Sequence, residues 1–245
     1  RKPDPAIFHY AARLANVPTS ECVYVGDRIS RDIVGARRAG FKLAIQIIND
    51  FDHGEEDDGA EPDAVITQMT QLLDIIQGEE RKSTPFGRAE TRTPSQVRAL
   101  LFDAGDILYH RPKGNLKFRE FLSELGIADK EIPETIKEEL KDQAFIGSIS
   151  QSQYREAILH LYGVIDPEPF ERGYRAIDED EKGIQIIKGV RETLKALKGK
   201  GYMLGIVTDS AQPIHIKLSW FEHGGFGHVW DSIISSQEIG VEKPD

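Results

Sequence analysis

The chain has 245 residues, enough for one large domain or two ordinary ones with a substantial core. Its 41 acidic and 31 basic residues give a net charge of −10, a sign that opposes binding to nucleic-acid phosphates or anionic lipid surfaces. No apolar run reaches the roughly 18 to 20 residues that cross a bilayer. We therefore expect a soluble protein whose partners are neither nucleic acids nor membranes.

Cysteine usage is the one indication of cellular compartment. The single cysteine, Cys22, lies in the apolar stretch ECVYVGD, so no internal disulfide can form and a structural core role is expected. On this ground alone we predict a cytoplasmic protein. The chain begins at Arg1 inside what looks like a motif, so we expect the native N-terminus, with any targeting segment, to lie upstream.

Residues 1–77 alternate between helical and strand patterns. Asp4-Pro5 marks a helix start. CVYV, FKLAIQII and DAVI are short apolar runs typical of buried strands, and SRDIVGARRAG predicts a helix that ends at Gly40. A further helix is expected through Ile76. This order is typical of a parallel sheet.

Residues 78–96 lack periodicity and are rich in Gly, Pro, Ser, Thr and charge, which predicts a linker. The second block, 97–245, opens with VRALLFD, an apolar run expected to form a central strand. From Leu116 to about Glu181 all apolar spacing is helical, which predicts a helical cap at about 113–182. The strand patterns YMLGIVT and DSIIS then alternate with helices.

These patterns predict an α/β fold, with a Rossmann-like parallel sheet, helices on both of its faces and a small helical cap domain. Polar loops follow the strand ends that are expected to carry chemistry, at Gly26-Asp27, Asp103 and Thr208-Asp209. Because the carboxyl ends of parallel strands converge on one crevice, these side chains are expected to share a site.

Four motifs carry a family resemblance. KPDPAIF is followed at a specific spacing by VYVGDRISRDIVGARRAG, and FDAGDILY and VTDS occur in the second block. With these motifs the chain resembles the haloacid dehalogenase (HAD) superfamily of aspartate-nucleophile hydrolases, over nearly all of its length outside the linker. Family members carry the motifs in the order I to IV, whereas here III and IV precede I and II.

The resemblance implies a phosphatase mechanism for the matching residues. Asp103 corresponds to the nucleophile, which accepts the phosphoryl group as an aspartyl phosphate that water then hydrolyses. Thr208, with the backbone amide of Asp209, corresponds to the phosphate-binding motif II. The lysine of motif III, which also binds phosphate, is Lys2 or Lys243. The implied substrate is a small phosphorylated metabolite, a phosphomonoester.

A metal ion is implied because the nucleophile and the phosphate are both anionic, and oxygen ligands favour Mg2+. By resemblance Asp103, the carbonyl of Gly105 and Asp27 hold the ion, with Asp32 in the outer shell. A structural role stays open for Asp27 and Asp32, because loop and first-turn acids are also favoured by the helix dipole.

Motif I departs from the family pattern DxDGT. Gly105 stands where the family has the acid that protonates the leaving group and activates water, and Ile107 stands in place of threonine. Loss of such acid–base help typically costs about 10^2 to 10^4 in rate. Asp106 lies one place further on, where strand alternation turns it away, although a loop can curl it back.

Three functions stay open. The first is a Mg2+-dependent phosphatase that Gly105 impairs or restricts to good leaving groups. The second is a catalytically silent HAD-fold domain that binds a ligand or partner. The third is another HAD chemistry such as dehalogenation, although dehalogenases of the family carry tyrosine where Gly105 stands.

The tripeptide Lys-Pro-Asp occurs at 2–4 and again at 243–245. We interpret the duplication as a cut through motif III of two successive HAD-like units, which makes the chain a fragment of a tandem protein. The linker reaches roughly 60 Å when extended, so the two blocks are expected to close into one permuted domain with both termini beside the site. The alternative, in which Asp27 and Asp103 belong to different native sites, stays open.

Overall fold

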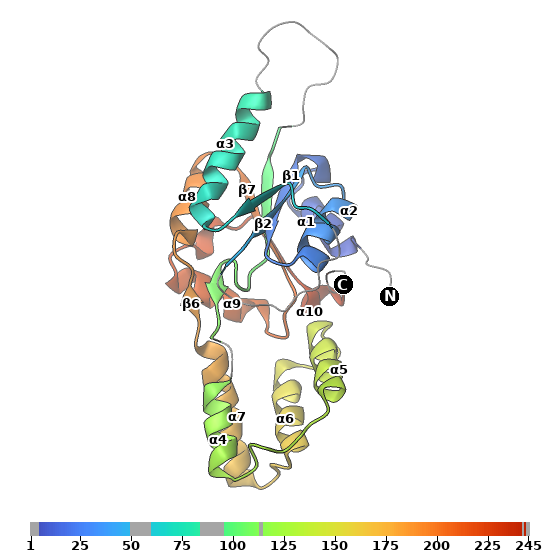
Figure 1. Ribbon diagram of the computed structural model, residues 1–245, viewed down its shortest axis with the longest axis vertical. Coiled ribbons are helices and arrows are strands. Elements are labelled where there is room, and N and C mark those ends of the chain that lie inside the picture. Colours follow the sequence, from blue (N-terminus) through green and yellow to red (C-terminus); the bar gives the residue numbers. More distant parts are fainter. Residues whose placement is uncertain (1–4, 50–59, 84–95, 113–114, 242, 244–245) are drawn as a thin grey trace, which may run out of the picture.

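The computed structural model of the chain describes residues 5–49, 60–83, 96–112, 115–241 and 243. For residues 81–83 it describes the backbone alone. Figure 1 shows an α/β core with a helical cap beyond one end of its sheet, the end at which β1, β4 and β7 finish. None of the described helices combines the length and the apolar character needed to cross a bilayer.

The core sheet has six strands in the order β3-β2-β1-β4-β7-β8, and every neighbouring pair is parallel. The strands are β1 (Cys22–Gly26), β2 (Leu43–Ile47), β3 (Ala64–Ile66), β4 (Ala99–Phe102), β7 (Met203–Thr208) and β8 (Ser232–Ser235). The central pair joins the two sequence blocks, with Cys22 opposite Ala99 and Val25 opposite Phe102. All six strands therefore form one sheet.

Strand residues alternate between two apolar layers, one on each face of the sheet. On β4, Leu100 and Phe102 join one layer, while Ala99 and Leu101 join the other. Because both faces of such a strand are covered, its sequence is apolar throughout, as VRALLFD is. The predicted Rossmann-like sheet with helices on both faces is confirmed.

Different helices cover the two faces. One face carries α1 (Ala6–Leu14) and α2 (Val34–Arg38), which follows a π-helical turn at η2 (Ile29–Ile33). The other carries α3 (Leu72–Ser83), α8 (Val190–Gly199) and α9 (Ile214–His223). The remaining short elements of the core are η1 (Thr19–Glu21), η3 (Met69–Gln71), η4 (Gly227–Val229) and α10 (Ser236–Ile239).

Helix α3 extends through Ser83, into the segment 78–96 that the sequence predicts to be a linker. The prediction was wrong for residues 78–83, because the glutamates there are anchored to the core. Glu79 lies 3.9 Å from Lys42, and Glu80 lies 3.8 Å from Lys200. Residues 84–95 of the predicted linker lie outside the described residues.

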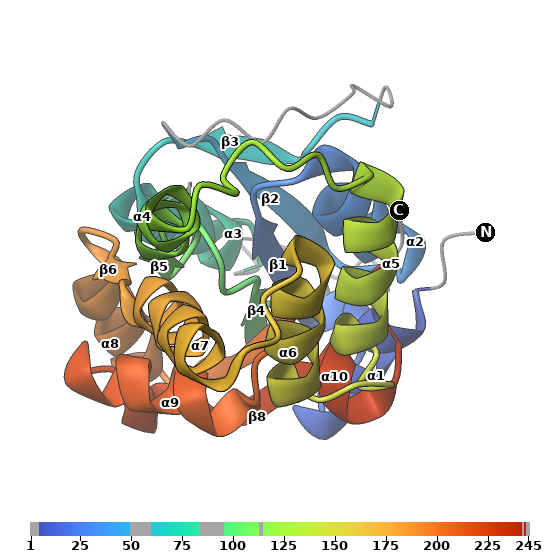
Figure 2. The same cartoon turned by 90° about the horizontal axis from the view of Figure 1, so that it is seen from below.

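The cap consists of α4 (Leu116–Glu124), α5 (Glu134–Phe145), α6 (Gln151–Tyr162) and α7 (Pro167–Lys182). Figures 1 and 2 show two pairs, α4 beside α7 and α5 beside α6. A small apolar core of its own, centred on Phe118, Phe121 and Leu159, joins α4, α6 and α7. The predicted helical cap is confirmed.

Two features connect the cap to the core. The chain enters and leaves the cap through an antiparallel pair of short strands, β5 (Tyr109–His110) and β6 (Gln185–Ile186). At the other side, Ser236 Oγ donates to the carbonyl oxygen of Phe145 at 2.8 Å. The end of α5 is thereby seated beside α10 (Figure 2).

Candidate functional site

A cavity of about 150 Å³ lies at the carboxyl ends of β1, β4 and β7, beneath α5 of the cap. Both sequence blocks and the cap contribute to it. Its lining residues are Asp27, Arg28, Arg31, Asp32, Asp103, Gly105, Asp106, Tyr109, Lys141, Phe145, Thr208, Asp209, Lys217 and Lys243. All predicted site residues that the structure describes therefore meet in this cavity, which we call the nucleophile cavity after the role predicted for Asp103, and Lys2 lies outside the described residues.

An acidic cluster forms one side of the cavity. Asp27, Asp32 and Asp103 each offer a carboxylate oxygen, and these oxygens lie within 4.8 Å of one another. Gly26, the last residue of β1, makes this approach possible, because a Cβ there would come within 2.5 Å of the Asp32 side chain. Asp32 accepts hydrogen bonds from the hydroxyl of Tyr24 at 3.0 Å and from the amide of Arg28 at 3.2 Å.

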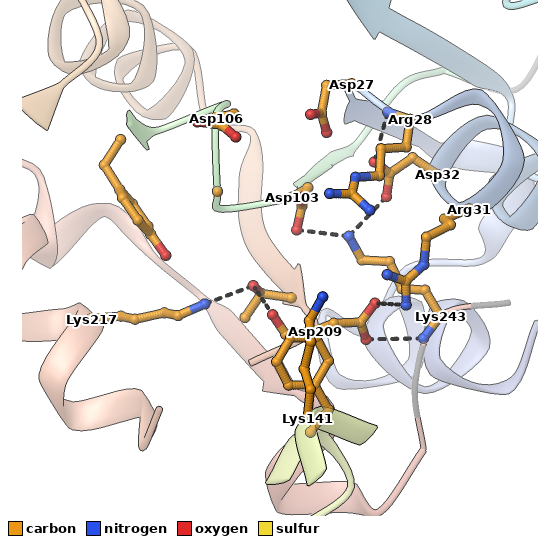
Figure 3. A pocket seen from close by; sticks show the side chains of 14 residues that line it. Asp27, Arg28, Arg31, Asp32, Asp103, Asp106, Lys141, Asp209, Lys217 and Lys243 are labelled. Carbon is orange, nitrogen blue, oxygen red and sulfur yellow. Dashed lines mark hydrogen bonds and ion pairs between the residues drawn. The ribbon is translucent and has the colours of Figure 1, made fainter. Parts of the chain in front are cut away.

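Lys243 bridges this acidic cluster (Figure 3). Its Nζ lies 2.8 Å from Asp32 Oδ1 and 2.7 Å from Asp103 Oδ1, and its backbone amide donates to Asp209 Oδ1 at 3.0 Å. Burial by itself lowers the pKa of the ammonium, but the neighbouring carboxylates, Asp103 foremost, raise it above its ordinary value. Lys243 therefore places a charged ammonium beside Asp103.

Thr208 ends β7, and its hydroxyl accepts a hydrogen bond from Lys217 Nζ at 2.8 Å. Lys217 projects from α9 and is 3% exposed. Burial lowers the pKa of its ammonium to about 7, even though Asp103 opposes the shift. Our sequence interpretation missed this residue. The signal was a single lysine within the apolar helical segment IHIKLSWF.

The turn after β4 carries the departure from the family motif. Gly105 has no side chain, and a Cβ there would meet no atom within 4 Å. Asp106 has a left-handed backbone with φ of 56°, which is uncommon for a residue other than glycine. Its amide donates to Tyr109 O at 2.7 Å, and its carbonyl accepts from Asn49 Nδ2 at 2.7 Å. This turn keeps Asp106 on the lining of the cavity, with Oδ1 2.7 Å from His110 Nδ1.

The acidic cluster suits a hard divalent cation. Asp27, Asp32 and Asp103 each offer a carboxylate oxygen to one point, and Lys243 contacts two of these three groups. All of the clustered ligand atoms are carboxylate oxygens, the donors that Mg2+ prefers. The residues present therefore fit the metal ion that the sequence predicts.

A parallel α/β core, an inserted helical cap and an aspartate-lined crevice at the strand ends define a capped α/β protein of Rossmann-like architecture. Two family models match the chain: residues 1–72 match a HAD-hydrolase-like model, and residues 113–245 match the haloacid dehalogenase-like hydrolase model. The second match covers more than half of the chain, which therefore belongs to the haloacid dehalogenase-like hydrolases. Motif I, including Gly105, lies between the two matched segments.

Individual relatives cover smaller parts of the chain. The glyceraldehyde 3-phosphate phosphatase of Methanopyrus kandleri is 41% identical over 80 residues, which are 31% of this chain and 33% of that protein. The phosphoglycolate phosphatase of Pseudomonas fluorescens is 33% identical over 73 residues, 30% of this chain and 26% of that protein. The matched segments thus span about a third or less of these relatives.

Among solved structures, the chain is similar to a predicted phosphoglycolate phosphatase from Haemophilus somnus. That likeness has a TM-score of 0.38 at 20% identity, and it covers 60% of this chain and 66% of the other.

Proposed function

We propose that this protein is a Mg2+-dependent phosphatase that acts on a small phosphomonoester through an aspartyl-phosphate intermediate on Asp103. The observation that carries the proposal is the contact of Asp103 with Lys243, in one cavity with the acids of motif IV and the hydroxyl of Thr208. The matched family models and the phosphatase relatives support the same reaction class.

In the first step, a carboxylate oxygen of Asp103 forms a bond to phosphorus while the bond from phosphorus to the leaving oxygen breaks. Lys243 orients the carboxylate through its ion pair with Oδ1. Thr208 and Lys217 donate hydrogen bonds to the phosphoryl oxygens as negative charge develops on them. When bound, Mg2+ supplies positive charge between the carboxylate and the phosphoryl group.

In the second step, water attacks phosphorus and Asp103 leaves. Both steps need a group that moves a proton, and Gly105 does not supply one. We assign this proton transfer, at lower efficiency, to Asp106, which lines the cavity and is hydrogen-bonded to His110. The proposed enzyme therefore favours substrates with good leaving groups, which need little proton transfer to depart.

Hydrolysis of p-nitrophenyl phosphate, measured with Mg2+ and with a chelator, tests this function. We expect turnover that requires the metal and that Asp103→Asn abolishes. Room for a side chain at position 105 makes Gly105→Asp a useful companion, because a restored acid should raise the rate by about 10^2 or more on substrates with poor leaving groups. An unchanged rate on those poor leaving groups would mean that proton transfer is not the limitation.

A silent HAD-fold domain is the second candidate, and the specific observation in its favour is the missing carboxylate at Gly105. This alternative predicts Mg2+ binding at the acidic cluster without turnover of any phosphomonoester. Calorimetric titration of Mg2+ into the wild type and into Asp27→Asn, beside the hydrolysis assay, separates the two functions.

A further inference from the structure

A second cavity, of about 390 Å³, adjoins the nucleophile cavity and extends toward the cap. We call it the cap cavity. The two cavities share Asp106, Tyr109, Lys141 and Lys217 among their lining residues, and Arg111 lines the cap cavity but not the nucleophile cavity. A molecule bound by its phosphoryl group at Asp103 would therefore extend into the cap cavity.

Arg111 enters the cap cavity from the segment that connects β5 to the cap. Its Nη2 donates to Gln212 Oε1 at 2.9 Å, and its guanidinium lies 5.6 Å from the ring centre of Trp220. The Nε atom of Arg111 is buried and has no hydrogen-bond partner among the described residues. A buried donor without a partner is costly, so this nitrogen is a site where a ligand acceptor would bind favourably.

Two lysines complete a positive group in the cap cavity. Lys141 projects from α5 of the cap into the pocket, with Nζ 5.3 Å from the ring centre of Phe145 (Figure 3). Lys217 Nζ donates to the hydroxyl of Thr208. Within the part of the chain that the structure describes, neither lysine forms an ion pair, and Arg111 forms none either.

The acids that line the cap cavity form ion pairs with side chains other than Arg111, Lys141 and Lys217. The pairs are Asp106 with His110 at 2.7 Å, Asp209 with Arg31 at 2.8 Å and Glu181 with Arg155 at 2.5 Å. Arg111 and Lys141 are therefore two cations without acidic partners in one cavity, in a chain of net charge −10. Neighbouring positive charges repel one another, and a bound anion removes this repulsion. The cap cavity therefore favours the binding of an anion.

We propose that the substrate carries a second anionic group, a carboxylate or a second phosphate, which Arg111 and Lys141 bind in the cap cavity. The inference rests on the proposed function and names the substrate class of the same site. Arg111 belongs to the core side and Lys141 to the cap, so the second anion links the two parts of the molecule. The planar guanidinium of arginine suits carboxylate and phosphate groups because it donates two parallel hydrogen bonds.

Two phosphonates that are not hydrolysed test the inference without relying on turnover. Methylphosphonate carries the phosphonate alone, whereas phosphonoacetate adds a carboxylate. We would measure both dissociation constants by titration calorimetry at one saturating Mg2+ concentration, and subtract the heat of each phosphonate titrated into the same buffer without protein, so that chelation of Mg2+ does not contribute. The wild type should bind phosphonoacetate about tenfold or more tightly than methylphosphonate, as expected for hydrogen bonds to a charged group.

The variants Arg111→Gln and Lys141→Gln remove one cation each, and Lys137→Gln is the matched control. Lys137 lies on the same helix as Lys141 but pairs with Glu134 at 3.1 Å outside both cavities. The ratio of the dissociation constant of methylphosphonate to that of phosphonoacetate should fall toward one in the two test variants. In the control it should stay at the wild-type value. Unchanged affinity for methylphosphonate in all variants shows that they are folded.

Equal affinity of the wild type for the two phosphonates overturns the inference, and so does a preference that survives both substitutions. Loss in one variant alone assigns the second anion to that residue. Methylenediphosphonate, as a third ligand, separates a second phosphate from a carboxylate by which of the two binds more tightly. Because p-nitrophenyl phosphate has no second anion, its turnover tests the phosphatase function separately from this preference.

Discussion

The two sides of the crevice have opposite charge and are held in opposite ways. The acidic wall consists of Asp27, Asp32 and Asp103 with the bridging Lys243, and the basic wall consists of Arg111, Lys141 and Lys217. On the acidic wall, Lys243 pairs with Asp32 and Asp103, and Asp32 also accepts hydrogen bonds from Tyr24 and Arg28. On the basic wall, the cations contact only neutral groups among the described residues.

The two buried lysines make the difference clear. Lys243 and Lys217 are 5% and 3% exposed, so burial is nearly the same for both. Carboxylates hold the pKa of Lys243 above its ordinary value, whereas burial brings the pKa of Lys217 down to about 7. Lys243 therefore has its counter-charge within the protein, and Lys217 is suited to receive one from a bound anion.

The largest effect is expected from breaking the acidic wall. Lys243→Met leaves Asp32 and Asp103 close together without their shared cation, and loss of one partner of a buried pair costs about 3 to 5 kcal/mol. The free energy of unfolding, measured in urea without metal, should fall by that order. Added Mg2+ should restore part of the loss, because the ion replaces positive charge at the same carboxylates.

A surface pair provides the control for this measurement. Lys198 contacts Asp231 at 2.5 Å, but the two side chains are 35% and 20% exposed. Exposed pairs contribute about 0 to 1 kcal/mol, so Lys198→Met should have a small effect. Similar losses in the two variants would show that Lys243 stabilises the fold no more than a surface lysine does.

Titration of Lys217, on the basic wall, should make the free energy of unfolding depend on pH. The pKa of Lys217 is about 7 in the folded protein against an ordinary value of 10.5. Between these values the unfolded chain binds a proton that the folded protein does not, so stability rises with pH, by at most about 1.4 kcal/mol per pH unit. Below about pH 7 both states are protonated and this contribution is flat.

Lys217→Met removes this titration. The difference in unfolding free energy between wild type and variant should shift in favour of the wild type from pH 7 to pH 9, measured by urea unfolding at each pH. All other titrating groups cancel in the difference. Parallel pH profiles for the two proteins would mean that Lys217 keeps an ordinary pKa in the folded state.

Much of the acidic wall could be predicted from the sequence, because strand ends in a parallel sheet have a fixed relation to one another. Asp27, Asp103 and Thr208 each follow an apolar run, and the topology brings such positions to one crevice. Lys243 was predicted together with Lys2, and the structure describes only Lys243. The tandem origin inferred from the repeated Lys-Pro-Asp stays a prediction.

The basic wall could not be predicted, since it depends on where helices pack. Lys217 and Lys141 lie on helices whose sequence patterns do not specify which residue faces the crevice. The position of Asp106 depends on a left-handed backbone that its sequence neighbours do not require. The end of α3 was missed because the contacts that hold Glu79 and Glu80 come from distant parts of the chain.

The smallest effect on stability is expected from alanine substitutions at Gly26 and Gly105, two glycines with different amounts of space around them. A Cβ at Gly26 would lie 2.5 Å from the buried side chain of Asp32, which Lys243 holds in place. Gly26→Ala should therefore cost about 1 to 3 kcal/mol of stability, as overpacking does. A Cβ at Gly105 would meet no atom within 4 Å, and Gly105 is not among the described glycines with positive φ.

Gly105→Ala should accordingly be neutral or stabilising by about 0.4 to 1 kcal/mol, because alanine restricts the unfolded chain. Urea unfolding of the two variants side by side measures the contrast. Opposite signs would indicate that the acidic wall is tightly packed, whereas the motif I turn has room for the side chain that the family carries there. If Gly105→Ala were as costly as Gly26→Ala, the turn would not accommodate an acid, and Gly105→Asp would not be expected to restore proton transfer.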